Sequence, residues 1–159
     1  MSISLIRVDD RLIHGQVLMG WTRALGVDHA LVADDQAAAD PMQGPLMRMA
    51  APTGLTVTIL PLDEAATALQ DDRYQRDRMI VIVRGPATLV RLHKSGLELS
   101  TVNVGNVRSG EGRSKLTKEV HASPEELEHW RYLDDAGVEL SAQWLPDQKR
   151  THLNPLVRA

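Results

Sequence analysis

The segment ISLIRVDDRLIHGQVLMGWTRAL, residues 3–25, decides the fold class of this chain. It opens with a short apolar run over residues 3–8, which favours a β-strand. It continues into residues 15–25, where apolar side chains recur at the spacing of one helix face. These side chains are Val17, Leu18, Trp21 and Leu25. A strand that runs directly into an amphipathic helix is the repeating unit of a parallel α/β sheet.

The same alternation of strand and helix continues along the chain. Further strands are expected at residues 29–33, 55–60, 78–84, 100–105 and 138–146, with a short extended segment at 117–121. Further helices are expected at residues 40–51, 64–69, 86–96 and 124–136. The run at 78–84 is almost entirely apolar, as in a central parallel strand covered on both faces. The pattern predicts an α/β fold with a mostly parallel sheet.

Local signals predict where several helices begin, end and pack. Asp63 is expected to cap the helix that follows it, and Gly96 and Gly137 are expected to end two others. The sequence SPEE, residues 123–126, is a capping-box pattern with Pro at the first helical position. In the helix that begins near the Asp-Pro pair at 40–51, the expected buried side chains are Leu46, Met47 and Ala50.

Composition narrows the class of protein. The chain has 159 residues, which suits a single domain spanning 1–159, and 43% of them are hydrophobic. A net charge of −3 argues against a nucleic-acid-binding surface. With no cysteine there are no disulfides or thiolate metal sites. We see no signal peptide and no apolar run long enough to cross a membrane, so we expect a soluble cytoplasmic protein without direct membrane insertion.

Polar clusters follow four of the expected strands. They are DDRLIHG at 9–15, DDQ at 34–36, RGP at 84–86 and NVGN at 103–106. Because the carboxyl ends of parallel strands meet at one edge of a sheet, these clusters should lie together. We therefore expect a functional site at that edge.

His14 is the candidate nucleophile of the first cluster. It stands at a strand-to-helix turn, before Gly15, which lets another molecule approach the backbone closely. The free N–H groups of the helix that begins there favour an anion. Imidazole is nucleophilic near neutral pH, so a covalent phosphohistidine is chemically sensible. A half-buried structural histidine is the alternative.

The three residues ahead of this turn each have two interpretations. Asp9 or Asp10 could cap the helix, or could hold one imidazole N–H of His14 and so direct the other nitrogen. Arg11 could be a solvated surface charge or could bind phosphoryl oxygens with both arms of its guanidinium group.

The other candidate sites are weaker. His29, His93, His121, His129 and His152 show no paired metal-ligand spacing, so we expect neither a metal nor a cofactor. The glycine-rich stretch NVGNVRSGEG, residues 103–112, matches neither the P-loop nor the dinucleotide fingerprint. It is either a flexible loop or one that closes over the site at the first strand.

Together these motifs resemble a known family. IRVDDRLIHGQV at 6–17 closely resembles the signature of the mannose-type (mannose/fructose/sorbose) IIB components of the bacterial sugar phosphotransferase system. The resemblance extends to ADD at 33–35 with DP at 40–41, and to the pattern at 50–60. It also includes VNVGN at 102–106, GEGRSKLTKEV at 110–120 and ELSAQWLPDQK at 139–149. It covers the chain from about Ser2 to Lys149.

The resemblance implies a fold and an activity. It implies a doubly wound domain with a mixed sheet of about seven strands, the last of which include an antiparallel pair. It implies a protein-Nπ-phosphohistidine–sugar phosphotransferase, in which His14 accepts a phosphoryl group on its δ1 nitrogen from a IIA phosphohistidine. The group then passes to a sugar held by the membrane components IIC and IID. No IIA segment is evident, so the IIB domain is expected to stand alone.

The resemblance also assigns residues. Asp10 and Arg11 match loop residues that would orient His14 and contact the phosphoryl group. Gly15 and Gln16 match the start of the first helix, and Asn103 and Gly105 match a neighbouring loop. Relatives often read Asn-x-Gly-Gly in that loop, where this chain has Asn106 in place of the second glycine.

The motifs also suggest a docking surface, and two other functions compete with the one that the resemblance implies. The donor protein should dock around the first loop, where Leu12, Ile13 and Met19 are candidates for an exposed apolar patch or for core residues. One rival is a regulatory phosphoprotein or binding module of the same fold that transfers nothing to sugar. Another is a magnesium-dependent aspartyl phosphoacceptor, which the absence of an aspartate after strand three and a lysine after strand five disfavours. Neither the sugar nor the oligomeric state can be read from this sequence.

Overall fold

The computed structural model describes residues 3–71 and 78–159. Seven strands form one sheet in the order β3-β2-β4-β1-β5-β8-β9, and β6 pairs with β7 in a separate ribbon. In chain order the sheet strands are β1 Ile3–Asp9, β2 His29–Ala33, β3 Thr56–Leu60, β4 Met79–Val83, β5 Thr101–Asn106, β8 Glu139–Ala142 and β9 Thr151–His152. The ribbon consists of β6 Ser114–Lys115 and β7 His121–Ala122. All pairings in the sheet are parallel except that of β8 with β9, so the mixed sheet with a late antiparallel pair is confirmed.

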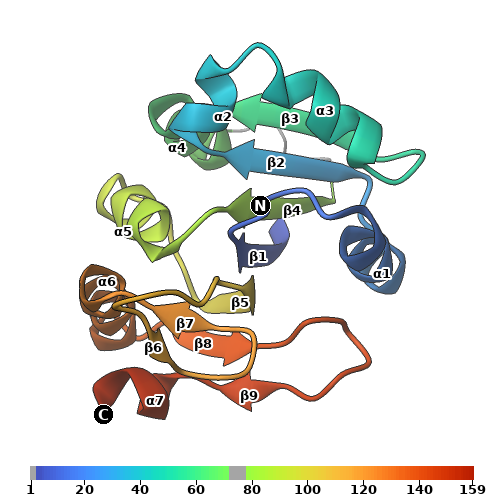
Figure 1. Cartoon of the computed structure of the whole chain (residues 1–159). Helices are drawn as coiled ribbons and strands as arrows, with labels where there is room; N and C mark the ends of the chain where they lie inside the picture. Colours follow the sequence, from blue (N-terminus) through green and yellow to red (C-terminus); the bar gives the residue numbers. More distant parts are fainter. Residues whose placement is uncertain (1–2, 72–77) are drawn as a thin grey trace.

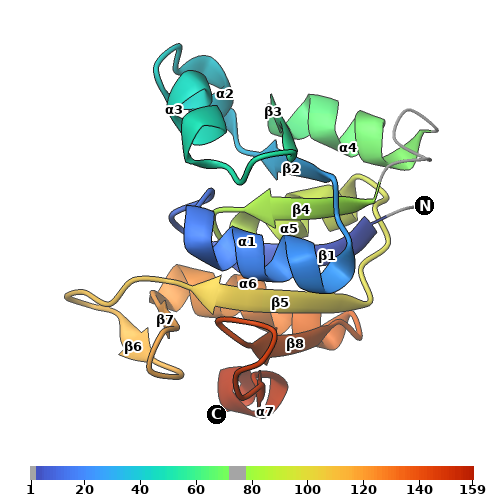
Figure 2. The same ribbon diagram turned by 90° about the vertical axis from the view of Figure 1, so that its right-hand side faces the viewer.

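Helices cover both faces of the sheet (Figures 1 and 2). They are α1 Gly15–Leu25, α2 Asp35–Ala39, α3 Gln43–Ala50, α4 Leu62–Gln70, α5 Pro86–Lys94, α6 Pro124–Asp135 and α7 Asn154–Arg158. Helices α4, α5 and α6 lie on one face and α1 on the other (Figure 1). This is the doubly wound α/β arrangement that the sequence predicts.

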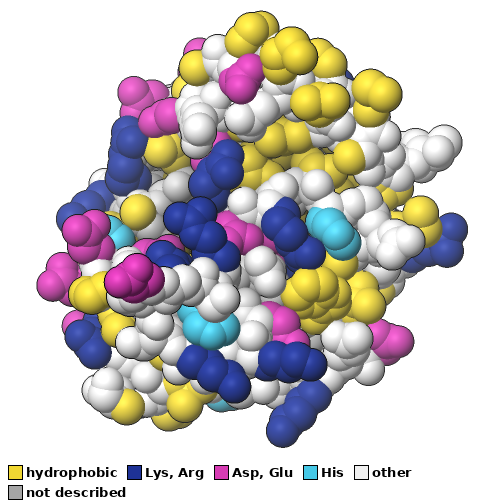
Figure 3. All heavy atoms as spheres, in the orientation of Figure 1, with side chains coloured by type: hydrophobic (Ala, Val, Ile, Leu, Met, Phe, Trp, Pro, Cys, Tyr) yellow, Lys and Arg dark blue, Asp and Glu magenta, His cyan; other side chains and the backbone are white. Residues whose placement is uncertain are grey.

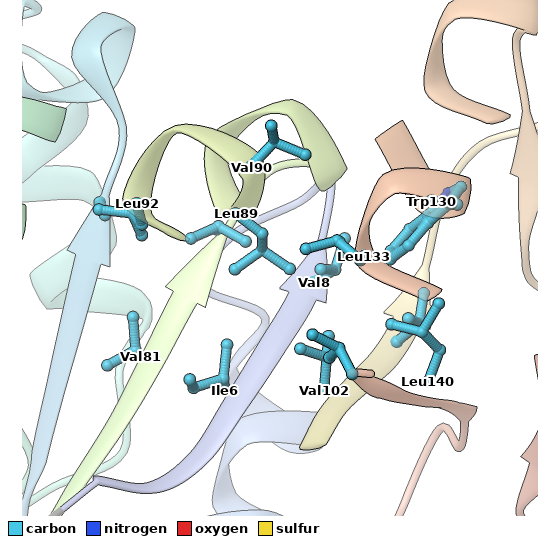
Figure 4. Packing of buried hydrophobic residues seen from close by; sticks show 14 of the residues in the cluster. Ile6, Val8, Val81, Leu89, Val90, Leu92, Val102, Trp130, Leu133 and Leu140 are labelled. Carbon is cyan, nitrogen blue, oxygen red and sulfur yellow. The ribbon is translucent and has the colours of Figure 1, made fainter. Parts of the chain in front are cut away.

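Alternate residues of each strand feed two separate apolar cores, because successive side chains of a strand point to opposite faces. On the side of α5 and α6, Val8 and Val81 pack with Leu89 and Trp130 (Figure 4). On the side of α1, the members include Ala30, Val32, Ile80, Ile82, Leu18 and Trp21. With no phenylalanine in the chain, aliphatic side chains fill most of both cores.

The order of the strands places a topological switch point at the end of β1. The chain leaves β1 toward α1 on one face, and leaves the neighbouring strand β4 toward α5 on the other face. Loops that depart in opposite directions from adjacent parallel strands leave a crevice between them, which is where ligands bind in such sheets. The polar clusters of the sequence meet at this edge of the sheet.

Several local predictions are confirmed. The first helix and the second strand have the predicted bounds. Ser123 accepts a hydrogen bond from the Glu126 backbone, and the Glu126 side chain returns one, so the capping box is present. Gly96 and Gly137 take φ values of 108° and 85° beyond the helices that they end.

Other local predictions are wrong: four short elements were not predicted, and one predicted helix cap is absent. The sequence missed α2, whose N-cap Asp34 accepts a hydrogen bond from the Ala37 backbone. It also missed β6, β9 and α7, which are too short to show a period. Asp63 is not a cap, because it lies inside α4, which begins at Leu62. The N–H of Leu62 donates to Asp35 instead.

Burial and strand length also differ from the prediction at particular positions. Leu25 ends α1 and is exposed, and in α3 Leu46 and Ala50 are exposed while Met47 is half-buried. The last predicted strand stops at Ala142, because the carbonyl groups of the next two residues bind side chains instead of a neighbouring strand. Of the extended segment at 117–121, only its last residue belongs to a strand.

Candidate functional site

A buried arginine forms the base of the site. Arg7, near the end of β1, is 2% exposed and donates to the Asn103 side chain. It also donates to the carbonyl oxygens of Gln143 at 3.1 Å and Trp144 at 3.2 Å. Removal from water lowers the pKa of Arg7 to about 10, although the nearby carboxylate of Asp9 opposes the shift. Arg7 is therefore a cation at neutral pH, and it holds together the ends of β1, β5 and β8.

Asp9 links this buried arginine to an arginine at the surface. Its carboxylate accepts from Arg7 Nη2 at 3.4 Å. It also accepts from the Arg11 backbone N–H and Nε at 3.0 Å each, and from Arg11 Nη2 at 2.9 Å. Asp9 is 1% exposed, so a two-armed contact inside the protein fixes the guanidinium group of Arg11.

An aromatic ring supports Arg11 from another side. The guanidinium carbon of Arg11 lies 4.5 Å from the centroid of the Trp144 ring, in the geometry of a cation–π contact. The side chain of Arg11 is 29% exposed, so part of its charge faces solvent. Arg11 is thus a fixed cation at the surface, which favours its interpretation as a functional residue over that of a solvated charge.

Asp10 was predicted to cap the first helix or to bind His14, but it binds the segment that follows β5. Its carboxylate accepts from Asn106 Nδ2 and from the Arg108 backbone N–H, both at 2.8 Å. Neither Asp9 nor Asp10 caps α1, because His14 itself occupies the N-cap position. The structure gives no hydrogen bond between either carboxylate and His14, since both groups are engaged elsewhere. Orientation of the imidazole by an aspartate therefore stays a prediction, which the contacts of Asp9 and Asp10 do not carry.

The loop from Asp9 to His14 has an unusual backbone. Leu12 has φ 58°, and it is the one non-glycine residue with a positive φ in the described ranges 3–71 and 78–159. Branched side chains take this conformation only where surrounding contacts impose it. Leu12 and Ile13 are 3% and 8% exposed, and they anchor the loop in the core on the side of α1. They are not the apolar patch of the prediction, and only Met19 is partly exposed.

His14 stands where the loop enters α1. The residue is half-buried and extended, with φ −121° and ψ 104°. Its Nδ1 atom is buried and has no hydrogen-bond partner among the described residues. The first turn of α1 has no acidic residue and no side-chain cap, so its free N–H groups are available to an anion.

Gly15 and Gln16 have separate roles at the start of α1. A Cβ atom on Gly15 would lie 2.6 Å from the carbonyl oxygen of Ala50, so glycine lets the end of α3 pack beside His14. Gln16 is exposed and lines a groove of about 460 Å³ with Met19 and Leu145.

Asn103 and Gly105, both on β5, hold Arg7 in place. Asn103 is 5% exposed, and its amide binds Arg7 and the carbonyl oxygen of Gln143. A Cβ atom on Gly105 would lie 2.0 Å from Arg7 Nη2, so the guanidinium group occupies the space that a side chain would need. Both residues belong to the site, but they act on Arg7.

A further arginine lies at the end of β4. Arg84 contacts Asp34 through Nε at 3.2 Å and Nη2 at 3.0 Å. The hydrogen bond to this carboxylate is the largest cause of the raised pKa of Arg84; partial burial opposes the rise, and the negative charges of Asp34 and Asp10 add to it. Figure 3 shows Lys and Arg side chains gathered in the middle of this face, with a His beside them. The edge is therefore locally basic on a chain of net charge −3.

Chemically, the site combines one nucleophilic imidazole with fixed positive groups. Within residues 3–71 and 78–159, no three His, Cys, Asp or Glu side chains come together as a metal site would require. No helix in the same described ranges has the length and apolar character needed to cross a bilayer. Arg7 and Trp144 contribute to the site although neither was predicted to, and Asn106, which was predicted to lie near the site, contributes a contact with Asp10 that was not predicted.

Comparison with known proteins gives a consistent assignment. The family model described as PTS system sorbose subfamily IIB component matches residues 3–159. The fructose-specific EIIB component of Bacillus subtilis is 32% identical over 146 residues, covering 92% of this chain and 90% of the relative. The mannose-specific EIIAB component of Escherichia coli is 28% identical over 157 residues, which cover 99% of this chain and 49% of that protein.

A solved structure extends the likeness to three dimensions. The IIBSor domain of the sorbose permease from Klebsiella pneumoniae superposes with a TM-score of 0.92 at 28% identity. The alignment covers 99% of this chain and 97% of that domain. From these matches, and from a fold and site that agree with them, the chain belongs to the sorbose subfamily of IIB components of the sugar phosphotransferase system.

Proposed function

We propose that His14 carries the phosphoryl group in this IIB phosphotransferase. An imidazole nitrogen of His14 attacks the phosphorus of a IIA phosphohistidine, and the donor nitrogen keeps the electron pair of the broken P–N bond. A sugar hydroxyl bound by the IIC and IID membrane components then attacks the same phosphorus. The His14–phosphorus bond breaks, and the hydroxyl proton is released as the sugar phosphate forms.

One observation supports this role above the others. His14 is a half-buried histidine at the N-terminus of α1, and three residues before it in the same loop is Arg11, which Asp9 and Trp144 hold in place. Phosphoryl transfer requires charge stabilisation around the equatorial oxygens more than it requires covalent chemistry by the protein. The free N–H groups of α1 and the guanidinium group of Arg11 supply that charge without a metal.

The nitrogen that reacts depends on the orientation of the ring. In the present rotamer Nδ1 is buried and unpaired, so phosphorylation at Nδ1 requires the ring to turn. A half-turn about the Cβ–Cγ bond exchanges Nδ1 with the carbon Cδ2. A buried nitrogen without a partner is unfavourable, and this favours the turn. We propose that transfer at Nδ1 uses the turned ring.

The phosphodonor would dock over the carboxyl edge of the sheet. Met42, Leu46 and Met49, called the apolar ridge below, are 68%, 58% and 82% exposed. Figure 3 shows hydrophobic side chains gathered over the region of α2 and α3. The ridge adjoins the site, because the last carbonyl of α3 packs against Gly15. A IIA domain that brings its histidine to His14 covers this ridge, and flexible methionines fit such transient contacts.

The triple variant Met42→Ser/Leu46→Ser/Met49→Ser removes the apolar ridge. It should weaken docking of the IIA donor and leave the phosphoryl-transfer step unchanged. We expect the donor concentration at half-maximal rate to rise at least about tenfold, because full burial of even one large apolar side chain contributes about 1.5–3 kcal/mol. The maximal rate of phosphoryl transfer should stay the same. Rapid-quench measurements with a phosphorylated IIA donor separate the two quantities. Leu156→Ser on α7, at 37% exposure, is the matched control, and an equal effect there would contradict the ridge.

Arg11→Lys should slow phosphoryl transfer while the protein remains folded. Lysine keeps the positive charge but cannot make the two-armed contact with Asp9 or stack on Trp144 in the same way. We expect the single-turnover rate to fall about 10- to 100-fold, the range for one misplaced charge-assisted contact. Arg23→Lys, an exposed arginine on α1, should react at the wild-type rate. A wild-type rate for Arg11→Lys would remove Arg11 from the mechanism.

The function as a whole is tested by reconstitution. Purified protein, a phosphorylated IIA donor and membranes that contain the matching IIC and IID components are supplied with labelled sorbose, fructose, mannose or N-acetylgalactosamine. We expect one sugar phosphate to form only when all components are present. Phosphorylation of the protein with no sugar phosphate from any sugar would contradict the transport role and indicate a regulatory phosphoprotein. We further propose that residues 1–159 act as one domain in the cytoplasm.

A further inference from the structure

Three hydrogen bonds join the loop that carries His14 to the end of β5. The Asp10 backbone N–H donates to the carbonyl oxygen of Asn106 at 3.0 Å. Asn106 Nδ2 donates to Asp10 Oδ1, and the Arg108 N–H donates to Asp10 Oδ2, each at 2.8 Å. Both oxygens of the carboxylate are therefore engaged by the segment that follows β5. These three contacts are called the Asp10–Asn106 latch below.

An irregularity in the sheet makes the latch possible. Along β1 and β5, Val8 pairs with Val104, but the next residue, Asp9, pairs with Asn106. Gly105 is thus the extra residue of a β-bulge, and bulges redirect the side chains that follow them. Here the bulge accommodates the guanidinium group of Arg7 and brings Asn106 opposite the start of the loop.

The loop needs such a restraint because its own backbone is unfavourable. Leu12, two residues before His14, has φ 58°. A non-glycine residue in this region costs about 1–3 kcal/mol, so it persists only where other contacts hold it. The latch and the contacts of Asp9 are the polar contacts that hold the first half of the loop.

We propose that Asn106 is a positioning residue for phosphoryl transfer, which acts through Asp10 to hold the loop that presents His14. This rests on the proposed function of His14. The amide is suited to the task, because it donates to a carboxylate without adding a second negative charge beside the phosphoryl group. A glycine at this position, as in the resemblance noted above, would leave one carboxylate oxygen without this donor.

The same contacts extend to a second loop. The Arg108 carbonyl accepts from Arg113 Nε at 2.9 Å, while its N–H is held by Asp10. The peptide groups on either side of Arg108 are thus fixed, and Figure 2 shows this segment running past the carboxyl end of the sheet toward β6. Loss of the latch should therefore loosen residues 107–113 as well as the loop before His14.

An exchange of the two partners tests the proposal. Asn106→Asp sets two carboxylates against each other, and Asp10→Asn sets two amides against each other. We expect each single variant to lower the maximal rate of phosphoryl transfer about tenfold, with the half-saturating donor concentration within about twofold of wild type. The double variant Asp10→Asn/Asn106→Asp restores a donor–acceptor pair and should return the rate to within about threefold of wild type.

Amide hydrogen exchange of the unphosphorylated protein provides a second readout. The Arg108 amide should lose protection in each single variant and regain it in the double variant. Ser109→Ala, an exposed residue of the same loop, is the control and should change neither quantity. Wild-type rates in the single variants, or a double variant no faster than either, would overturn the proposal. If wild-type protein accepts no phosphoryl group, the proposed function fails first, whatever the exchange data show.

Discussion

The variant His14→Ala is expected to accept no phosphoryl group and to support no sugar phosphorylation. In the proposed function the imidazole of His14 is the nucleophile that attacks the phosphorus of the donor phosphohistidine. Loss of a covalent nucleophile removes the reaction route itself, so the rate should fall by at least about 10³-fold. The measurement is the gain of one acid-labile phosphoryl group in the intact mass after incubation with a phosphorylated IIA donor.

Folding should survive this change, which makes the result interpretable. His14 occupies the N-cap of α1 without making a side-chain capping hydrogen bond, and its Nδ1 has no partner in the described structure. The circular dichroism spectrum and the urea midpoint should therefore stay near wild type. His152→Gln, an exposed histidine on β9, is the matched control and should be phosphorylated normally. An undiminished acid-labile signal in His14→Ala would contradict the assignment.

Gly105→Ala is expected to have the largest effect on stability and to inactivate the site as well. The added Cβ atom would lie 2.0 Å from Arg7 Nη2, 2.3 Å from Cζ and 2.9 Å from Nε. The whole guanidinium group would have to move, although it is buried and bound to four groups. Overpacking costs about 1–3 kcal/mol, and displacement of the guanidinium group weakens its buried ion pair as well, so we expect about 2–4 kcal/mol less stability.

Activity should fall with stability, because Arg7 holds Asp9 and Asp9 holds Arg11. Urea unfolding and the single-turnover rate of the folded fraction measure the two effects separately. Gly85→Ala is the control, because a Cβ atom there meets only Glu126 at 3.8 Å and the backbone is extended. Its loss of stability should not exceed about 1 kcal/mol. Equal stability of the two alanine variants would show that the space beside Gly105 is not restricted.

Much of the fold could be predicted because its central elements carry strong local signals. The first helix combines a glycine at its start with three buried residues at helical spacing, Val17, Leu18 and Trp21. The strands β2 and β4 are buried at every position; β4 is an uninterrupted apolar run, and β2 is apolar after His29. The capping box of α6 depends on residues three positions apart, so it is also visible locally.

The elements that were missed lack such local signals. Helix α3 lies within the helix predicted over residues 40–51, but its predicted buried face is wrong, because the helix has no buried residue and Leu46 faces solvent. The short elements α7 and β9 depend on tertiary contacts. For example, Asn154 accepts from Leu140 N–H at 2.8 Å and donates to Asp134 at 2.8 Å.

The residues of the site divide in the same way, into those with a local sequence signal and those without one. His14 and Arg11 were identified because they lie together in one motif near a helix start. Arg7, Asn106 and Trp144 act through partners about 100 or more positions away, and no spacing within one segment shows this. One sequence signal was available for Arg7, because a charged residue between Ile6 and Val8 in a buried strand needs a partner. The role of Asp10 likewise depends on distant residues, Asn106 and Arg108, whereas Asp9 binds Arg7 and Arg11 within its own segment.

The most direct test is the site of the phosphoryl group in the wild-type protein. Protein labelled with ¹⁵N in its histidines is phosphorylated by a IIA donor, and long-range ¹H–¹⁵N correlation spectra identify the modified ring and its nitrogen. We predict that one ring is modified, that it belongs to His14, and that the phosphoryl group is attached to Nδ1. A phosphoryl group on any other residue, or unchanged histidine signals after phosphorylation, would contradict the account, and attachment at Nε2 would contradict the turned ring.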